Sequence, residues 1–225
     1  MPETMSGAQD QAVVRASRLD IATISDALDR LGIQGQCHRI APRSPAFRLS
    51  GRAFTVLFRP AGMPPGTVGD FIDNVTPGSV IVLDNGGRED ATVWGDILTE
   101  IAHRNGIAGT VIDGISRDVA LALDLGYPIY SRGHWMRTGK DRVQVDAMQV
   151  SVNIGQARVA PGDLLRGDAE GVLVIPQEHE LRVLDAAEEI AAVEEGIRNA
   201  VREGSSLRAA RERFRHHQLQ TREAH

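Results

Sequence analysis

Lysine is almost missing from this 225-residue chain, and its scarcity disfavours two kinds of chemistry. Of the 25 basic residues only Lys140 is a lysine, and the other twenty-four are arginines. A Schiff-base enzyme needs a lysine amine whose pKa is lowered, usually by burial, whereas Lys140 lies in the polar, turn-like segment RTGKDR. No GxxxxGK[ST] phosphate loop occurs either. Schiff-base catalysis and P-loop nucleotide chemistry are therefore disfavoured.

Cysteine and long apolar runs are equally scarce. Cys37 is the only cysteine, so no internal disulfide forms, which suits a reducing compartment. The first residues, MPETMSGAQDQ, lack the apolar core of a signal peptide, and no apolar run approaches the ~18 residues of a membrane span. The net charge of −5 is opposite to that of a nucleic-acid-binding surface. We expect a soluble cytoplasmic protein without nucleic-acid or membrane partners.

Several catalytic motifs are absent as well. The sequence contains no HExxH zinc motif, no GxSxG nucleophile elbow and no GxGxxG dinucleotide fingerprint. None of the seven histidines has a paired metal-ligand spacing. His134, which follows Arg132 and Gly133, is expected at the surface, with a place near a pocket as the alternative. Cys37 lacks a catalytic context and is expected to be a small buried side chain.

The central part of the chain alternates between strand and helix patterns. Continuous apolar runs of strand length occupy Ser79–Asp84 and Ile107–Asp113, and PIYSRG (128–133) is a third short strand. Helical patterns separate them, at Val93–Asn105 and from a Ser116 cap to Leu125. The pattern predicts a right-handed parallel βαβαβ unit.

The flanking segments complete a single α/β domain. Thr23–Gly32 is expected to form a helix with a Thr23–Asp26 capping box. The short strand patterns of 143–176 predict an additional, antiparallel β layer. We assign residues 1–20 to an N-terminal extension, 21–215 to the domain and 216–225 to a polar tail. Other expected elements are a strand at 49–59, short helices at 70–78 and 205–214, a turn at Asn85–Gly87, and a C-terminal helix whose apolar face comprises Leu181, Leu184, Ala187, Ile190, Ile197 and Val201.

Two acidic helix starts meet at one edge of the predicted sheet. Asp96 follows Gly95 at the start of one helix, and Arg117-Asp118 follows the next strand. Ligands bind at the carboxyl edge of such sheets. Taken singly, each aspartate has an alternative interpretation, in which it only complements a helix dipole. Together, two carboxylates, an arginine and the free amides of Ile97 and Leu98 suit a divalent cation with a chelating oxo-acid.

The spacing D-x20-R-D and the order of the surrounding segments carry a family resemblance. These segments include TISDALDRLG, TPGSVIVLDNGG, WGDILTEIA, GIAGTVIDGISRD and VAPGDLLRGDAEGVLVIP, and the likeness extends from Ile21 to Phe214. The chain resembles the RraA-like family, in its class II pyruvate aldolase branch. The enzymes of that branch are 4-hydroxy-4-methyl-2-oxoglutarate / 4-carboxy-4-hydroxy-2-oxoadipate aldolases.

The resemblance implies a compact, swivelling-domain-like α/β fold in homotrimers or homohexamers with sites between subunits. It implies that Asp118 holds Mg²⁺ or Mn²⁺, that Asp96 acts through the metal's waters, and that Arg117 binds the keto oxygen. Substrate-binding residues would be Gly95, Asp96, Ile97, Leu98 and Arg117, with Glu194 of a neighbouring subunit as a possible addition.

The implied reaction cleaves a 4-hydroxy-2-oxo acid through a pyruvate enolate, and oxaloacetate decarboxylation would use the same enolate. Two rivals stay open. The family also contains regulators that bind and inhibit ribonuclease E, and some relatives carry an older methyltransferase label, which no glycine-rich motif supports here. A branched tricarboxylate substrate would need further cations, for which Arg88, Arg132 and Arg137 are candidates.

Overall fold

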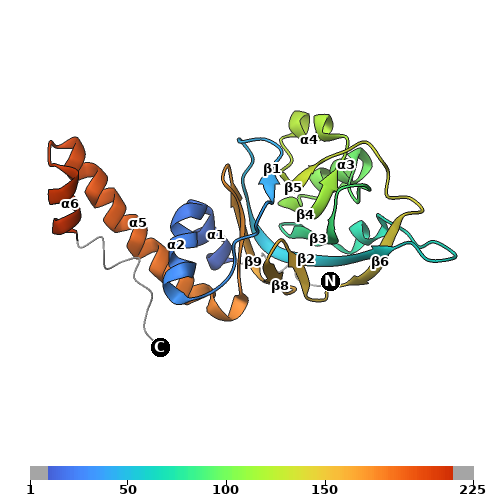
Figure 1. The fold of residues 1–225 in the computed structure, drawn as a ribbon, viewed down its shortest axis with the longest axis horizontal. Helices are drawn as coiled ribbons and strands as arrows, with labels where there is room; N and C mark the ends of the chain where they lie inside the picture. The colour runs from blue at the N-terminus through green and yellow to red at the C-terminus, as the bar shows by residue number, and fades with distance from the viewer. Residues whose placement is uncertain (1–9, 215–225) are drawn as a thin grey trace, which may run out of the picture.

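The computed structural model describes residues 10–214, and its main feature is one large sheet with helices on its faces and at one end (Figure 1). The strand order is β1-β5-β4-β3-β2-β9-β10, and β6 pairs with β2. The strands are β1 (Ala41–Pro42), β2 (Leu49–Pro60), β3 (Val80–Arg88), β4 (Gly109–Ser116), β5 (Ile129–His134), β6 (Val143–Met148), β9 (Leu164–Asp168) and β10 (Gly171–Ile175).

The centre of the sheet is parallel, which confirms the α/β prediction. The pairs β2–β3, β3–β4 and β4–β5 are all parallel. Every residue of β4 is buried, as expected for a strand covered on both faces. The crossover helices are α3 (Asp96–Arg104) and α4 (Val119–Leu125), which lie side by side (Figure 1). Because both crossovers start at the carboxyl ends of their strands, both helix starts lie at that edge.

The predicted antiparallel layer is only partly separate from this sheet. The strands β6, β9 and β10 pair antiparallel but join the main sheet, because the 12-residue strand β2 continues past its parallel partner. The separate piece is the hairpin of β7 (Val152–Ile154) and β8 (Ala157–Val159). Buried carboxylates within β3 and β4 hold it: Asp84 accepts the Asn153 amide at 3.0 Å, and Asp113 accepts the Gly155 amide at 3.1 Å.

Three helices cover the β9–β10 end of the sheet: α1 (Gln11–Ser17), α2 (Ile21–Leu31) and α5 (Glu180–Arg202). The helix α2 begins earlier than predicted, because the side chain of Asp20, not Thr23, caps it by accepting the Thr23 amide at 2.8 Å. Its end at Gly32, in the left-handed conformation, is as predicted.

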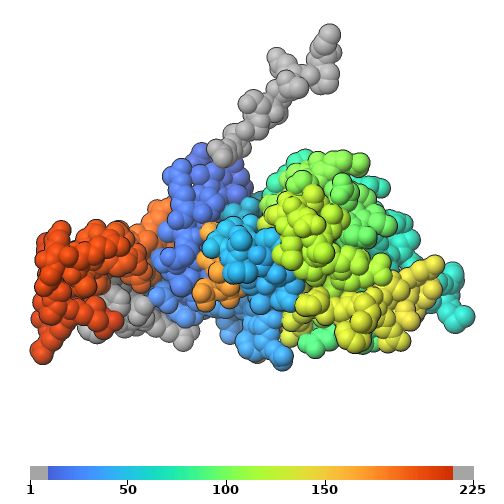
Figure 2. All heavy atoms as spheres, turned by 90° about the horizontal axis from the view of Figure 1, so that it is seen from above, coloured from blue at the N-terminus to red at the C-terminus, as the bar shows by residue number. Residues whose placement is uncertain are grey.

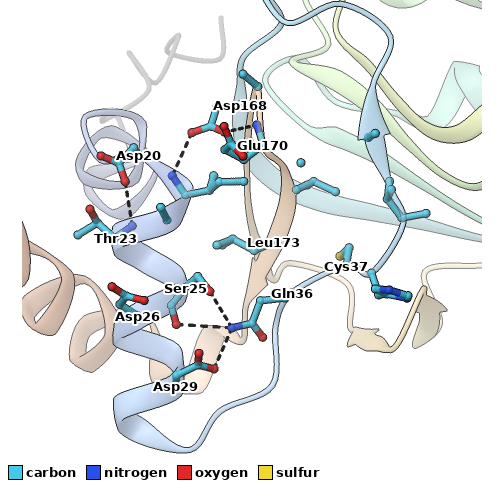
Figure 3. Close-up of a pocket in the computed structure, with 18 of the residues that line it drawn as sticks. Asp20, Thr23, Ser25, Asp26, Asp29, Gln36, Cys37, Asp168, Glu170 and Leu173 are labelled. Carbon is cyan, nitrogen blue, oxygen red and sulfur yellow. Dashed lines mark hydrogen bonds between the residues drawn. The ribbon is translucent and has the colours of Figure 1, made fainter. Parts of the chain in front are cut away.

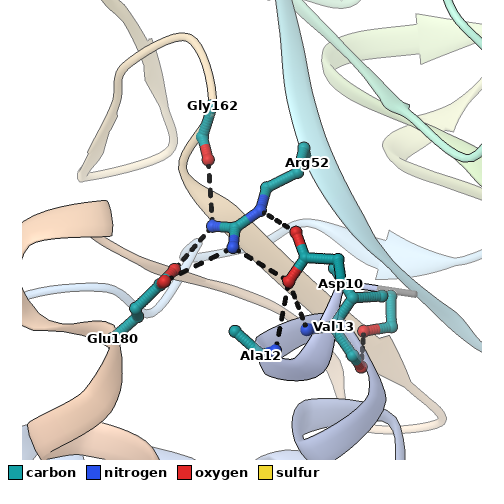
Figure 4. A network of polar contacts seen from close by, with 7 residues as sticks. Asp10, Ala12, Val13, Arg52, Gly162 and Glu180 are labelled. Carbon is teal, nitrogen blue, oxygen red and sulfur yellow. Dashed lines mark hydrogen bonds and ion pairs between the residues drawn. The ribbon is translucent and has the colours of Figure 1, made fainter. Parts of the chain in front are cut away.

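Arg52 joins these helices to the sheet (Figure 4). From β2 its guanidinium donates to Asp10 at the start of α1, at 2.7 Å, and to Glu180 at the start of α5, at 2.5 Å. Asp10 also accepts the amides of Ala12 and Val13, which caps α1. One arginine therefore connects segments from both ends of the chain.

The second half of α5 and the short helix α6 (Leu207–Arg213) extend away from the body as an arm (Figures 1 and 2). The arm has its own small core of Ile197, Ala200 and Ala210. The predicted apolar face of α5 is buried at four of its six positions. It is wrong at Leu181, in the first turn of α5, and at Val201, in the arm, because both side chains are exposed.

Two predicted boundaries need correction. The Asn85–Gly87 segment does not end its strand, since β3 runs to Arg88 through Gly86 and Gly87 at positive φ with a shift in register. The predicted helix at 70–78 is a single 3₁₀ turn, Asp70–Asn74. The predicted 216–225 tail lies outside the described residues. No helix within 10–214 is long and apolar enough to cross a membrane.

Candidate functional site

The structure brings Asp96, Arg117 and Asp118 together at the carboxyl edge of the parallel strands. Asp96 is the first residue of α3, three residues later than the predicted start at Val93, and Gly95 is its N-cap. The Arg117 amide donates to the Trp94 carbonyl at 3.0 Å, which joins the end of β4 to the segment before α3. The residues of the D-x20-R-D pattern thus meet through backbone contacts as well as side chains.

The side chain of Asp118 points to α3 and not to its own helix. Asp118 is the N-cap of α4 and has a left-handed backbone with φ of 55°, yet it caps no amide of α4. Its Oδ2 lies 3.1 Å from Arg117 Nε and accepts the Asp96 amide at 3.3 Å. Asp118 therefore gives its own helix no capping hydrogen bond, while its position as N-cap keeps its charge at the start of α4, where it also complements the helix dipole. The predicted cap Ser116 is also wrong, because Ser116 ends β4 with a buried, unpartnered hydroxyl.

Gly95 is the residue that lets these groups approach. A Cβ atom at this position would lie 2.9 Å from Asp118 Oδ2 and 3.2 Å from Arg117 Nε. Contacts this short force a neighbour to move, so any larger residue would push the carboxylate and the guanidinium away from the helix start. The glycine is therefore required by the site itself.

The amides at the start of α3 differ from the prediction in one respect. Ile97 was expected to offer a free amide, but its N–H already donates to Asp96 Oδ1 at 2.8 Å. The Leu98 amide has no hydrogen-bond partner in the described part of the chain. A carboxylate thus already occupies one amide of this helix start, and a second amide is open to an incoming anion.

A cavity of about 400 Å³ opens beside these groups. The segment around Gly95, the 3₁₀ turn at Asp70–Asn74, Arg117 and the turn Thr138–Lys140 line it. Sequence analysis missed Lys140, and no local pattern marks it. The turn reaches the cavity because a parallel bridge joins Thr138 to Thr92, a contact between segments more than forty residues apart.

Asp118 is the residue best suited to hold a metal ion. Its side chain is 41% exposed, and only Oδ2 makes contacts with other described residues. The other carboxylate oxygen forms no hydrogen bond or ion pair with any residue of 10–214. Within residues 10–214 no cluster of three or more acidic, histidine or cysteine side chains has a metal-binding arrangement. One carboxylate with water ligands fits Mg²⁺, which keeps several waters when bound.

The other candidate residues lie away from this cavity. Arg132 forms a buried ion pair with Asp113, and Arg88 pairs with Asp90 at 2.9 Å. Neither they nor Arg137 line the cavity beside Gly95. His134 ends β5 and is exposed, as expected for a surface histidine.

A larger cavity, of about 1390 Å³, lies between α2, β10 and the 36–41 segment (Figure 3). Gln36 spans it and donates to Ser25 at 3.0 Å and to Asp29 at 3.1 Å. Cys37 is buried here as predicted, and burial raises the pKa of its thiol to about 12. Glu194 lines this cavity, 3.5 Å from Arg198 in α5. In its own subunit Glu194 therefore does not line the cavity beside Gly95, and Asp118 borders that cavity without lining it.

The fold and the site define an α/β protein with an aspartate–arginine centre at the carboxyl edge of a parallel sheet. The chain belongs to the RraA-like family, since the family model described as Aldolase/RraA matches residues 21–174. The predicted family and fold are thereby confirmed.

Relatives and solved structures agree with this assignment. The chain is 32% identical, over 94% of its length and 99% of the other, to a Halalkalibacterium halodurans protein named "Putative 4-hydroxy-4-methyl-2-oxoglutarate aldolase". It is 40% identical to Protein DlpA of Legionella pneumophila over 86% of this chain, and it spans only 32% of that protein's length. The crystal structure of Streptomyces coelicolor RraAS2, described as an unusual member of the RNase ES inhibitor RraA protein family, superposes with a TM-score of 0.77 at 27% identity. The superposition covers 84% of this chain and 96% of the RraAS2 chain.

Proposed function

We propose that the protein is a divalent-metal-dependent lyase that releases pyruvate from a 4-hydroxy-2-oxo acid such as 4-hydroxy-4-methyl-2-oxoglutarate. The observation that carries the proposal is the side chain of Asp118, which turns away from its own helix to meet Arg117 and the start of α3. The aldolase name of the Halalkalibacterium relative supports the same reaction class.

Arg117 binds the keto oxygen of the substrate. Its Nε lies 3.1 Å from Asp118 Oδ2, and neither Nη group donates a hydrogen bond to a residue of 10–214, so both can donate to a ligand. As the C3–C4 bond breaks, its electron pair moves onto the 2-oxo group, and a pyruvate enolate forms. A fixed guanidinium at the developing oxyanion stabilises the transition state, and loss of such a donor typically costs about 10²–10³ in rate.

The start of α3 binds the carboxylate of the pyruvyl half. Leu98 offers its open amide, and the Ile97 amide becomes available when the Asp96 side chain rotates away. Asp96 is then free to orient the water that removes the C4 hydroxyl proton. When bound at Asp118, Mg²⁺ or another divalent cation supplies the Lewis-acid charge for enolate formation.

Oxaloacetate is a second expected substrate. Loss of CO₂ from oxaloacetate breaks a bond in the same position relative to the 2-oxo group and leaves the same enolate. Arg117 and the amides of α3 need no rearrangement to stabilise it. The same site is therefore expected to act as an oxaloacetate decarboxylase.

We further propose that the protein works as a cytoplasmic homo-oligomer, a trimer or a hexamer. Large apolar side chains remain exposed in one copy, among them Ile97 at 70%, Trp135 at 49% and Met136 at 72%. Ile97 borders the site, so a second copy that covers it would also close the cavity. Glu194 of a neighbouring subunit, carried on the arm, is the residue proposed to complete the site.

The test is pyruvate release from oxaloacetate and from 4-hydroxy-4-methyl-2-oxoglutarate, measured with Mg²⁺ and then with EDTA. Wild type should turn over both substrates in a metal-dependent way. Asp118→Ala should lose turnover, and Arg117→Lys should lose about 10²–10³ in kcat. Turnover that survives both EDTA and Asp118→Ala would refute the proposal.

A second candidate function is inhibition of an RNase E-type ribonuclease by direct binding, and the likeness to RraAS2 favours it. A binding regulator has no need of the Asp118 carboxylate. If the protein inhibits RNase E cleavage of a structured RNA, and Asp118→Ala inhibits equally well, the regulatory function holds independently of the lyase site.

A further inference from the structure

We propose that Trp94 is a positioning residue of the candidate site, which holds Arg117 through its backbone and the first turn of α3 through its indole. The inference rests on the proposed function and adds to it a residue that acts through its neighbours. Its starting point is the place of Trp94 in the chain, since this side chain is 2% exposed and directly precedes Gly95, the N-cap of α3.

The backbone of Trp94 holds the strand side of the site. Its carbonyl oxygen accepts the Arg117 amide at 3.0 Å, so the residue that binds the keto oxygen is attached directly to Trp94. The segment 91–94 is buried throughout, and the Thr92 amide donates to the Arg137 carbonyl at 3.0 Å. Trp94 therefore gives Arg117 a fixed point of attachment.

The indole of Trp94 holds the helix side of the site. Trp94 Nε1 donates to Thr99 Oγ1 at 2.9 Å, and Thr99 Oγ1 donates to the Gly95 carbonyl at 2.9 Å. The same carbonyl accepts the Thr99 amide at 3.0 Å. An indole N–H is a donor only, so Thr99 must accept it, and the hydroxyl hydrogen of Thr99 is left for Gly95. The indole thus fixes the peptide group that directly precedes the open amides of α3.

The ring of Tyr127 keeps the indole in this orientation. The two rings are nearly parallel, with 6° between their planes and 6.2 Å between their centroids. Both rings are 2% exposed, and the Tyr127 hydroxyl is hydrogen bonded to Thr110 Oγ1 at 2.8 Å. Rotation of the indole would leave its N–H unpaired in the core, which burial disfavours. One orientation of Trp94 therefore sets the spacing between Arg117 and the start of α3.

This arrangement predicts unequal effects on the two kinetic constants. In the transition state Arg117 must face the developing oxyanion while the α3 amides hold the carboxylate. A ground-state ligand can bind with one of these contacts displaced, so it tolerates a change of spacing better. A loosened Trp94 should therefore lower kcat for pyruvate release more than it raises KM.

The experiment breaks the indole–hydroxyl bond from either side and measures oxaloacetate turnover with Mg²⁺. Trp94→Phe and Thr99→Val should each lower kcat about 10-fold, because a displacement of ~1 Å can cost ~10²-fold and a smaller one is expected here. KM should stay within about threefold of wild type. Because both changes break the same bond, the double variant should lose no more than Thr99→Val alone. Thr99→Ser keeps the hydroxyl and should restore most of kcat.

Tyr127→Phe is the matched control. It also removes a buried hydrogen bond beside Trp94, the one to Thr110, but it keeps the ring that stacks on the indole. Its midpoint of urea denaturation should fall as in the other variants, while its kcat should stay within about twofold of wild type. A loss of kcat that only reflects lower stability would appear in this control as well.

Trp94 also supplies a readout that does not depend on turnover. The chain has two tryptophans, and Trp135→Phe leaves Trp94 as the only one. Its indole is linked through Thr99 to the peptide that precedes the α3 amides. Pyruvate added with Mg²⁺ should therefore shift the emission of Trp94 in a saturable way, and EDTA should abolish the shift. Thr99→Val in this background should weaken the response.

The outcomes separate this inference from the proposed function. If wild type releases pyruvate but Thr99→Val and Tyr127→Phe have equal kcat, or if pyruvate leaves the emission of Trp94 unchanged in an active enzyme, the role of Trp94 is refuted and the lyase proposal stands. If pyruvate shifts the emission and Thr99→Val weakens the shift, while no substrate is turned over, Trp94 positions a binding site and the lyase proposal fails. If wild type neither turns over substrate nor responds to pyruvate, both proposals fail.

Discussion

The carboxylate of Asp118 accepts a hydrogen bond from the backbone amide of Asp96, at 3.3 Å, across the gap between two helix starts. The two residues are 22 positions apart in sequence. The contact places a negative charge from one crossover against the positive end of the dipole of the next helix. It therefore sets the spacing between the Asp118 carboxylate and the α3 amides.

Gly95→Ala should separate the groups of the site without unfolding the protein. The new Cβ would lie 2.9 Å from Asp118 Oδ2, so the carboxylate must move. We expect pyruvate release from oxaloacetate to fall at least ~10-fold, since misplacement by about 1 Å can cost ~10²-fold. Gly133→Ala is the matched control, because its Cβ meets nothing closer than 3.7 Å. Equal activity of the two variants would refute the role of Gly95.

Thr99→Val should destabilise the start of α3. Buried Thr99 Oγ1 accepts the Trp94 Nε1 hydrogen at 2.9 Å and donates to the Gly95 carbonyl at 2.9 Å. Valine keeps the shape but leaves the indole N–H unpaired, which costs about 1–3 kcal/mol. Urea denaturation should show this loss, whereas Thr99→Ser keeps the hydroxyl and should retain more stability. A smaller loss in Thr99→Val than in Thr99→Ser would contradict the prediction.

Cys37 should resist alkylation in the native protein. Burial, and to a smaller extent the negative charge of Asp113, raise the pKa of the thiol to about 12. At pH 8 only about one thiol in 10⁴ is then ionised, and the thiolate is the reactive form. Mass spectrometry after treatment with iodoacetamide should detect little label in the folded protein and complete label in urea. Rapid native labelling would show that the 36–41 segment opens readily.

Asp10 should make stability depend on pH in the acid range. The hydrogen bond from Arg52 holds the pKa of this carboxyl below its ordinary value of 3.8. Its contribution is therefore complete above the unfolded pKa, about 4, and is lost as pH falls through the lower folded pKa. Asp10→Asn should be less stable than wild type at pH 6, and the difference should shrink below pH 4. Asp10→Ala also loses the cap of α1, at a cost of roughly 1 kcal/mol. An Asp10→Asn difference that stays constant with pH would refute the ionic role.

The parallel core could be predicted because the composition of each strand and of the turn after it is visible in the sequence itself. Val80–Leu83 is uniformly apolar and Gly109–Ile112 has Thr110 as its one polar residue, and the glycines and aspartates that follow mark the sheet edge. The meeting of Asp96 with Asp118 followed from topology alone, since adjacent crossovers start at one edge. These parts of the fold and of the site can be predicted without knowing any side-chain contact.

What sequence analysis missed depends on contacts between distant segments. The start of α2 is also fixed from a distance, because the Ile21 amide donates to Asp168 of β9 at 3.0 Å. Lys140 lines the cavity because the bridge between Thr92 and Thr138 brings its turn there. No pattern within RTGKDR indicates this contact. Val201 is exposed on the projecting arm and Leu181 in the first turn of α5, whereas helical periodicity alone assigns both to a buried face.

The left-handed backbone of Asp118 affects which substitutions this position tolerates. A non-glycine residue at φ of 55° carries a conformational cost that glycine avoids. Replacement by glycine therefore relieves strain while it removes the carboxylate that faces α3. At this position a change that relieves backbone strain would also remove the carboxylate that the proposed chemistry needs. The backbone conformation and the proposed activity therefore make opposite demands on the residue at position 118.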